Sequence, residues 1–297
     1  MNPLVILLVL LSALLHVTWN ILGKSGTPSK AFFFVASFSS VLFLLPFLII
    51  TNFNFSIIRD IWFYLFLSGF FMAVYYSGLS GGYRSGEMSL VYPLARALPV
   101  LFVPFISVVI GNIEGITFFP FLGMVIVFTG CIILPQLNIR RFSFAGYFKT
   151  YSFYAVLAAF GTSGYTILDS IGMGIIKTAD IKPVSGSIFY FTIQMIFTSL
   201  FLGTNILFSR MEKEQLLKIL QSEKIHTISA GLLVAAAYII ILICYPMVLN
   251  VSYITAFRQI SIPLGAFAGI FLLKEKWSIS KVSGVFIIFA GLLIVYL

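Results

Sequence analysis

The chain has 297 residues, of which 60% are apolar and only 9% are charged, and its mean hydropathy is +1.09. This composition excludes an ordinary soluble protein. Apolar stretches of about 20 residues, long enough to cross a bilayer core of about 30 Å, recur from one end of the chain to the other. The sequence therefore predicts an all-α, multi-pass membrane protein.

The apolar pattern predicts ten transmembrane helices. Their expected ranges are 4–23, 31–51, 61–83, 88–110, 116–136, 148–170, 186–208, 227–248, 251–273 and 280–297. The first stretch lacks the basic n-region and the small-residue cleavage site of a signal peptide, so it is expected to be a span. The connections are too short for a domain outside the membrane.

Lysines and arginines are distributed unevenly between the predicted loops. The loops after odd-numbered spans hold Lys24, Lys30, Arg84, Arg140, Arg141, Lys149, Arg210, Lys213, Lys218, Lys224, Lys274, Lys276 and Lys281, whereas those after even-numbered spans hold Arg59, Lys177 and Lys182. The protein is expected in the inner membrane of the cell. By the positive-inside rule, the loops after odd-numbered spans face the cytoplasm and both termini lie outside. The net charge of +9 is thus interpreted as a topology signal and a contact with lipid headgroups, not as a nucleic-acid-binding surface.

Cys131 and Cys244 both fall within apolar spans, without histidine or cysteine companions at metal-ligand spacing. They are interpreted as small buried apolar side chains. Neither a metal site nor a cofactor is expected from the sequence.

Seven positions of the first half recur in the second half. The matched pairs are Gly69/Gly231, Tyr76/Tyr238, Tyr83/Tyr245 and Arg96/Arg258 at an offset of 162, followed by Glu114/Glu275, Gly123/Gly284 and Gly130/Gly291 at an offset of 161. Residues 19–22 (WNIL) align weakly with residues 165–168 (YTIL). The paired glycines are spaced i and i+7, so they are expected to allow close helix packing.

The repeat predicts two five-helix units, 1–143 and 144–297. Because five is odd, the second unit enters the membrane in the opposite orientation, and a pseudo-two-fold axis in the membrane plane relates the two. Inverted repeats with a binding site at their interface are typical of secondary transporters that work by alternating access.

The motifs also resemble a known family. The ending E-x8-G-x6-G of each half, the ten spans and the five-plus-five repeat resemble the EamA family of the drug/metabolite transporter superfamily over essentially the whole chain. The segments HVTWN (16–20), GGYRSGEMSLVYPLARALP (81–99), YTILDSIG (165–172) and FRQISIPLGAFAG (257–269) resemble a branch described as phosphonate-utilisation-associated membrane proteins. The resemblance implies transport without ATP hydrolysis, and the sequence contains no G-x4-GK[ST] loop.

Arg96 and Arg258 lie inside predicted spans, where an arginine costs about 2.5 to 3.5 kcal/mol. Each is expected about 10 to 12 Å from the end where its helix enters the membrane. They either snorkel to the headgroups or bind a ligand. Pro93, Pro99 and Pro263, which disturb helical hydrogen bonding, favour a cavity nearby. A guanidinium matches carboxylate or phosphonate oxygens, so the pair predicts an anionic or zwitterionic solute.

Other polar residues of the spans are candidates for the same site. Asp169, predicted near the end of its span, and His16 are candidates for carrying a coupling proton; the alternatives are a helix-end residue for Asp169 and a hydrogen-bonded packing role for His16. The candidates for lining the substrate cavity are Trp19, Asn20, Tyr76, Tyr238, Gln194 and Gln259. Tyr83 and Tyr245 are expected in aromatic belts, and Glu114 and Glu275 at helix ends.

These features predict a secondary transporter that moves a small polar organic solute by alternating access, through a cavity between two inverted five-helix halves. The protein is expected to act as a monomer or homodimer. Two alternatives stay open. One is a carrier or flippase for a phosphate-bearing lipid or a nucleotide sugar. The other is an intramembrane enzyme, although the sequence contains no H-E-x-x-H, no paired aspartates and no G-x-S-x-G.

Overall fold

The computed structural model describes residues 2–50, 55–86, 88–109, 117–133, 136, 148–272, 274 and 278–296. Every regular element in these ranges is helical. The α-helices are α1 (Pro3–Ser25), α2 (Lys30–Ile50), α3 (Ile58–Ser85), α4 (Met88–Ala97), α5 (Pro99–Val109), α6 (Phe118–Ile133), α7 (Thr150–Thr178), α8 (Pro183–Phe208), α9 (Arg210–Lys218), α10 (Lys224–Cys244), α11 (Val251–Phe257), α12 (Ser261–Leu272) and α13 (Ile279–Tyr296). The prediction of an all-α protein is confirmed for the described residues.

Several helices are suited to a bilayer. Six segments are long and apolar enough to cross it: Pro3–Ser25, Lys30–Ile49, Phe55–Ser85, Val91–Val109, Pro183–Phe208 and Arg210–Met247. Two further apolar helices, Phe118–Ile133 and Val282–Val295, are shorter. Large apolar side chains such as Phe43, Phe105 and Phe286 are exposed on the outer surface, where lipid would cover them. This is the pattern of a multi-pass membrane protein.

Two of the predicted spans are interrupted. The expected helix 88–110 breaks at Leu98 between α4 and α5, because Pro99 has no N–H and disfavours helical backbone in the residue before it. The expected helix 251–273 breaks at a 3-10 turn, Arg258–Ile260, three to five residues before Pro263. Each interruption therefore lies beside one of the two arginines that the sequence places inside the membrane.

Another span is longer than expected. Helix α7 runs to Thr178, eight residues beyond the predicted end at 170. Asp169 consequently lies within the helix and is fully buried, with 0% of its surface exposed. Its interpretation as a helix-end residue at the interface is therefore wrong. Ser170 and Gly172, which favoured an early end, continue the helix because α3 and α8 pack against it.

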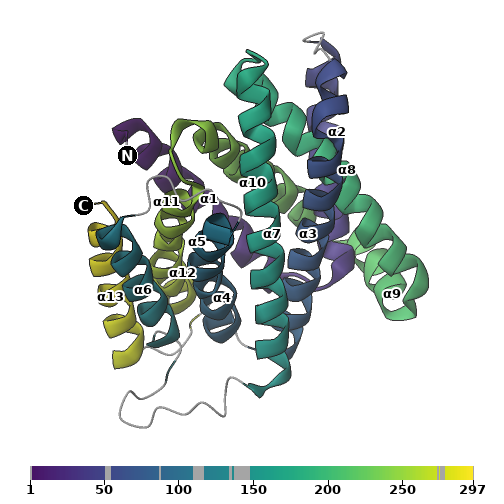
Figure 1. Ribbon diagram of the computed structural model, residues 1–297. Coiled ribbons are helices and arrows are strands. Elements are labelled where there is room, and N and C mark those ends of the chain that lie inside the picture. The colour runs from purple at the N-terminus through teal and green to yellow at the C-terminus, as the bar shows by residue number, and fades with distance from the viewer. Residues whose placement is uncertain are drawn as a thin grey trace.

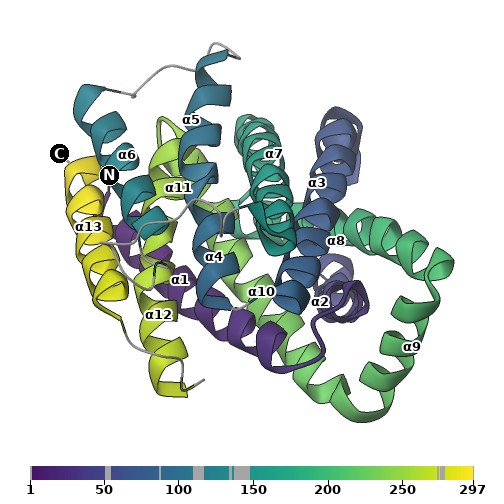
Figure 2. The ribbon, with the colours of Figure 1, turned by 90° about the horizontal axis from the view of Figure 1, so that it is seen from below.

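The helices form two neighbouring groups (Figures 1 and 2). One group contains α2, α3, α7, α8 and α10, with α3 packed along α7 and α2 along α8. The other contains α4, α5, α6, α11, α12 and α13, with α6 packed along α13. Helix α1 runs between the groups, packing on α10 in the first and on α12 in the second. The polar residues of α1 thus lie at the junction.

Glycines permit the tight pairing of α6 with α13. A Cβ atom added to Gly123 would lie 2.7 Å from the carbonyl oxygen of Gly291, and one added to Gly291 would lie 2.7 Å from that of Gly123. Cβ atoms are not found that close to a backbone, so larger residues would force the helices apart. The expectation of close packing at these glycines is confirmed.

Candidate functional site

Helix α1 carries a buried polar turn at the centre of the molecule. His16, Trp19 and Asn20 are all buried. The Trp19 indole donates a hydrogen bond to His16 Nδ1 at 3.2 Å, and the Asn20 amide donates to the His16 carbonyl at 2.8 Å. The Tyr83 hydroxyl of α3 donates to Asn20 Oδ1 at 2.8 Å. These bonds hold the imidazole and indole rings in fixed orientations against α3.

Arg96 lies near the end of α4, just before the break at Leu98. Its side chain is buried in the protein, with 3% exposed, so snorkelling to the headgroups is excluded. A guanidinium nitrogen contacts His16 Nε2, and the guanidinium carbon lies 5.6 Å from the centre of the Tyr92 ring. Its Nε has no hydrogen-bond partner within the described part of the chain. Arg96 is therefore a buried cation with unused donor capacity.

Arg258 is the counterpart of Arg96 in the second half. It begins the 3-10 turn between α11 and α12 and is 5% exposed, so it does not snorkel either. Its guanidinium carbon lies 5.5 Å from the centre of the Tyr238 ring, in a cation–π contact. Across the described residues, neither arginine forms a salt bridge. Two positive charges are thus buried at the centre, and no carboxylate of the described part of the chain pairs with either of them.

His16 meets hydrogen-bond donors at both ring nitrogens, the Trp19 indole at Nδ1 and the Arg96 guanidinium at Nε2. A neutral imidazole accepts at only one nitrogen, and a protonated imidazole accepts at neither. The positive charge of Arg96 also repels a proton on the ring. These surroundings favour neutral His16 and leave the guanidinium short of acceptors.

A small cavity lies between α1, α3, α7 and α10. Its volume is about 20 Å³, which is room for about one water molecule. Its wall is largely aromatic, formed by Trp19, Tyr75, Tyr76, Tyr165 and Tyr238. The remaining lining residues are Ser12, His16, Met72, Val234, Ala237 and Arg258. The cavity therefore presents one guanidinium, one imidazole and several hydroxyl groups within an apolar frame.

Asp169 lies at the centre of a second buried polar cluster, next to the cavity. Its carboxylate accepts hydrogen bonds from Ser68 Oγ of α3, from Gln194 Nε2 of α8 at 2.9 Å and from the Tyr238 hydroxyl of α10 at 2.5 Å. All three donors are neutral. No lysine, arginine or histidine is paired with Asp169 among the described residues. Tyr238 connects the cluster to the cavity, because its hydroxyl contacts Asp169 and its ring faces Arg258.

The structure brings together most of the residues that the sequence indicated. Five of them line the cavity: His16, Trp19, Tyr76, Tyr238 and Arg258. Arg96 reaches it through His16, while Asp169 and Gln194 belong to the adjacent cluster.

Besides Gln194, two predicted lining residues are not in the cavity wall. The Asn20 side chain is held by Tyr83 and the His16 carbonyl. The Gln259 amide donates to the Thr255 carbonyl of the preceding turn at 2.9 Å. Each therefore uses its amide nitrogen to support the local backbone.

Tyr83 and Tyr245 also differ from expectation. They are 2% and 3% exposed, so the prediction that they belong to aromatic belts at the membrane surface is wrong. The Tyr83 hydroxyl supports Asn20, and the Tyr245 hydroxyl lies 3.5 Å from that of Tyr238. Helix α3 extends past the predicted end at 83 to Ser85, whereas Tyr245 begins the 3-10 turn Tyr245–Met247 directly after α10. Both rings are buried against neighbouring helices. Glu114 and Glu275 lie outside the described residues.

The sequence interpretation missed Tyr75, Tyr165 and Ser68. One signal for Tyr165 was present, because the weak alignment of residues 165–168 with 19–22 sets Tyr165 opposite Trp19, and both line the cavity. Tyr75 and Ser68 have no such mark, since single tyrosines and serines are common in helices that pack tightly. Only the meeting of α3 with α7 shows their role.

Comparisons with known proteins extend the description of the fold. No family model and no curated protein matches the sequence. A solved structure titled "Crystal structure of protein" is similar over 99% of this chain and 98% of its own, with a TM-score of 0.67 and 14% sequence identity. At that identity the likeness concerns the fold alone. It shows that the whole chain adopts an arrangement that another protein also uses.

Proposed function

We propose that the protein is a secondary transporter that carries a small anionic or zwitterionic organic solute across the inner membrane. The observation that carries this proposal is the burial of Arg96 and Arg258 without a carboxylate partner among the described residues. A buried unpaired charge is costly unless a partner compensates it. A carboxylate, phosphonate or phosphate group of a solute would supply that partner.

The surroundings of the arginines support an organic solute. Guanidinium nitrogens bind carboxylate and phosphonate oxygens in a planar, two-pronged geometry. The tyrosine and tryptophan rings of the cavity give apolar faces for a carbon skeleton, and such faces also attract the ammonium group of a zwitterion. The cavity wall therefore combines recognition of one anionic group with loose contacts to the remainder of the solute.

The helix contacts support an inverted repeat. In the proposed repeat, α1, α2 and α3 correspond to α7, α8 and α10. The contact of α3 with α7 then corresponds to that of α10 with α1, and the contact of α3 with α8 to that of α10 with α2. All four contacts are present. The pairs α2/α8 and α6/α13 would each map onto themselves, and both pack together. This pattern supports two opposed five-helix units and, with the sequence motifs, membership in the EamA family.

Hydrogen bonds follow the same exchange. Thr198 Oγ1 of α8 donates to the Gly69 carbonyl at 3.2 Å, and Ser40 Oγ of α2 donates to the Gly231 carbonyl at 2.8 Å. Gly231 stands 162 positions after Gly69, the offset of the sequence repeat. A hydroxyl group of α8 thus bonds to a glycine of α3, and a hydroxyl group of α2 bonds to the matching glycine of α10. In both cases the second helix of one half holds the third helix of the other half.

The interrupted helices support alternating access. A cavity of about 20 Å³ is too small for an organic solute, so loading requires the helices to part. The breaks at Leu98 and at Arg258–Ile260 give α4/α5 and α11/α12 places to bend beside each arginine. Bending on one side at a time would expose Arg96 and Arg258 to opposite membrane faces.

Asp169 is the proposed carrier of a coupling proton. Its carboxylate is buried among neutral donors, so protonation removes a charge from the interior without breaking a salt bridge. His16 is less suited, because the adjacent Arg96 opposes a second positive charge. Tyr238 contacts both Asp169 and Arg258, so a proton on one and an anion on the other would influence each other.

Uptake by proteoliposomes tests the function. We expect Arg258→Ala and Arg96→Ala to reduce uptake of the transported solute at least about 100-fold, because each removes a charged contact to the anion. The matched control is Arg59→Ala, which removes an exposed arginine outside the cavity. Carboxylates, phosphonates, amino acids and nucleotide sugars are screened first by thermal shift, since a bound ligand raises the melting temperature.

Gel filtration and circular dichroism of each variant show that it is folded. Undiminished uptake by both folded arginine variants contradicts the proposal. A screen in which nucleotide sugars alone stabilise the protein would shift the function to the alternative carrier.

A further inference from the structure

A second and larger pocket lies away from the central cavity. Its volume is about 520 Å³, and it is bounded by the C-terminal turns of α3 and α8 and by the starts of α2, α7 and α9. It shares no lining residue with the central cavity. The pocket lies at the end of the molecule where the loops after odd-numbered spans concentrate lysine and arginine.

Two cations line this pocket. Lys30 Nζ donates a hydrogen bond to Asn205 Oδ1 at 2.8 Å, and the Arg84 side chain is 43% exposed. Glu212 lies 3.5 Å from Arg84 and is almost fully buried, with its other oxygen accepting from the Ala31 backbone N–H at 3.0 Å. The carboxylate therefore holds Arg84 in place, and both cationic side chains line the pocket.

Neutral donors and apolar side chains complete the pocket. The hydroxyl groups of Ser77, Ser80, Thr204 and Ser209 lie in its wall. Leu157, Met211 and Phe208 supply apolar surface, and Phe208 is 90% exposed. Cations, hydroxyl groups and apolar surface together match the boundary between lipid headgroups and acyl chains.

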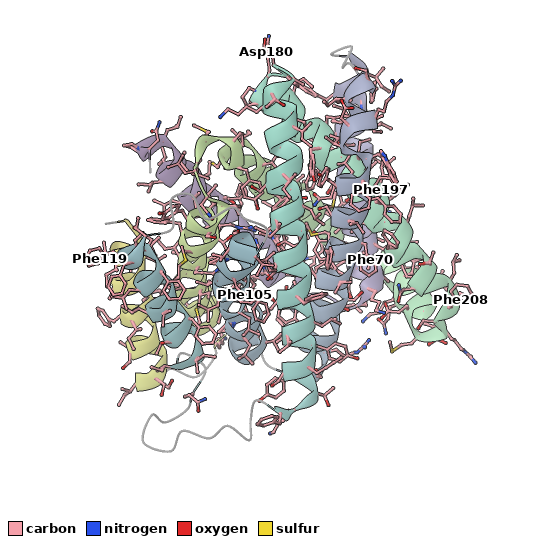
Figure 3. All side chains as sticks on the ribbon, in the orientation of Figure 1. Phe70, Phe105, Phe119, Asp180, Phe197 and Phe208 are labelled. Atoms are coloured by element: carbon pink, nitrogen blue, oxygen red, sulfur yellow. The ribbon has the colours of Figure 1, made fainter. Side chains whose placement is uncertain are left out.

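An aromatic strip continues from the pocket along the outer face of α3 and α8. Phe66 and Phe70 of α3 pack edge-on against Phe201 of α8, with ring centres 5.3 and 5.4 Å apart, and Phe66 also packs against Phe197. In Figure 3, Phe197 lies above Phe70 on the side of the molecule formed by α3 and α8, and Phe208 lies lower and further to the right, near α9. The strip and the pocket therefore form one surface.

The dimensions of this surface suit a phospholipid. Ser77 follows Phe70 by seven residues in α3, and Thr204 follows Phe197 by seven in α8, which is about 10 Å along each helix. One leaflet of hydrocarbon is about 15 Å thick. Acyl chains lying on the strip would thus place a phosphate group beside Lys30 and Arg84.

The two halves differ at this surface, unlike at the central cavity. The position 162 residues after Arg84 holds Pro246, which carries no charge. A transported solute needs related sites on both sides, whereas a lipid of one leaflet needs only one. The cytoplasmic leaflet, which the lysine and arginine distribution assigns to this end, is the one rich in anionic lipid.

We propose that this pocket binds an anionic phospholipid, with its phosphate held by Lys30 and Arg84 and its acyl chains lying on Phe66, Phe70, Phe197 and Phe201. The bound lipid would hold α9 against α2, α3 and α8. The site does not depend on the transport function. A soluble phosphate ion shares the headgroup chemistry and is the competing occupant.

Native mass spectrometry of the full chain tests the proposal. Protein in detergent is mixed with equal amounts of phosphatidylglycerol and phosphatidylcholine, and the retained lipid is counted. We expect phosphatidylglycerol to be preferred, and Lys30→Ala/Arg84→Ala to weaken its retention at least about tenfold, because both cations that attract the anionic headgroup are removed. The control Arg59→Ala/Lys182→Ala removes two exposed cations from the opposite end and should retain the lipid.

Two further variants distinguish loss of lipid binding from unfolding and from binding of a soluble anion. Lys30→Ala alone leaves the Arg84–Glu212 contact in place, so a loss of phosphatidylglycerol cannot result from unfolding around Glu212. The double variant Phe70→Ser/Phe201→Ser should weaken the retention of phosphatidylglycerol but leave any binding of inorganic phosphate unchanged. Equal retention of both lipids, or full retention by Lys30→Ala/Arg84→Ala, overturns the proposal. Stabilisation by millimolar inorganic phosphate, with no effect of the phenylalanine changes on lipid, assigns the pocket to a soluble anion instead.

Discussion

At the scale of single residues, Asp169 separates proton coupling from solute binding. We expect Asp169→Asn to abolish accumulation driven by a pH gradient while solute exchange between equal pH values continues. The reason is that asparagine binds no proton at neutral pH but keeps the shape of the side chain. Ser68 and Tyr238 donate to different oxygens of Asp169, so the amide oxygen accepts from one of these hydroxyl groups while the amide nitrogen donates to the other. Uptake and exchange in proteoliposomes are the measurements.

Asp180 provides the matched control. It lies at the exposed tip after α7, with φ at 55°, a left-handed conformation that asparagine also tolerates (Figure 3). Asp180→Asn should therefore leave both activities unchanged. Gradient-driven accumulation by Asp169→Asn at the wild-type rate removes Asp169 from the coupling, and loss of exchange as well would instead mark it as part of the solute site.

At the scale of the elements, a polar contact fastens the start of α10 to the connection between α1 and α2. Glu223, in the π-helical turn Ile219–Glu223 ahead of the expected span 227–248, accepts hydrogen bonds from Thr27 N at 2.9 Å and Thr27 Oγ1 at 2.6 Å. Partial burial opposes ionisation of this carboxyl, but the bonds from Thr27 and the charge of Lys218 outweigh it and lower the pKa of Glu223. The contact links the two halves at one end.

The lowered pKa gives this contact a pH dependence. A carboxyl whose pKa is depressed by folding stabilises the protein above its unfolded pKa, about 4.3, and loses that contribution as the pH falls through the folded value. We expect Glu223→Gln to lower the melting temperature in detergent by about 2 °C at pH 7. The difference from wild type should shrink below pH 4 or so, and a difference independent of pH contradicts the assignment.

At the scale of the whole molecule, the pairing of α6 with α13 contributes stability at a distance from the cavity. We expect Gly123→Leu to destabilise the protein by about 1 to 3 kcal/mol, because a Cβ at this position meets the Gly291 carbonyl and forces the helices apart. Thermal unfolding in detergent measures the change. Gly174→Leu is the control, since a Cβ at Gly174 meets no atom within 4 Å; equal melting temperatures for the two variants contradict the packing argument.

The internal repeat made some residues of the candidate site predictable from the sequence alone. Arg96, Arg258, Tyr76 and Tyr238 were identifiable because rare residues recur at one spacing. Asp169 was identifiable as a buried charge, but its place in the helix was not, because the end of α7 depends on its neighbours. Tyr165 was marked only by a weak alignment, and Ser68 by nothing in the sequence.

The sequence by itself determined the class of the protein: apolar runs of bilayer length require helices, because unpaired backbone groups are too costly in hydrocarbon. The prolines of the sequence did not fix where the helices break, because Pro93 and Pro104 lie inside continuous helices, whereas α4 ends at Ala97, two residues before Pro99. Only the tertiary structure decided which polar groups meet. Asp169, Ser68, Gln194 and Tyr238 come from four different helices, and their contact depends on packing between segments far apart in the chain.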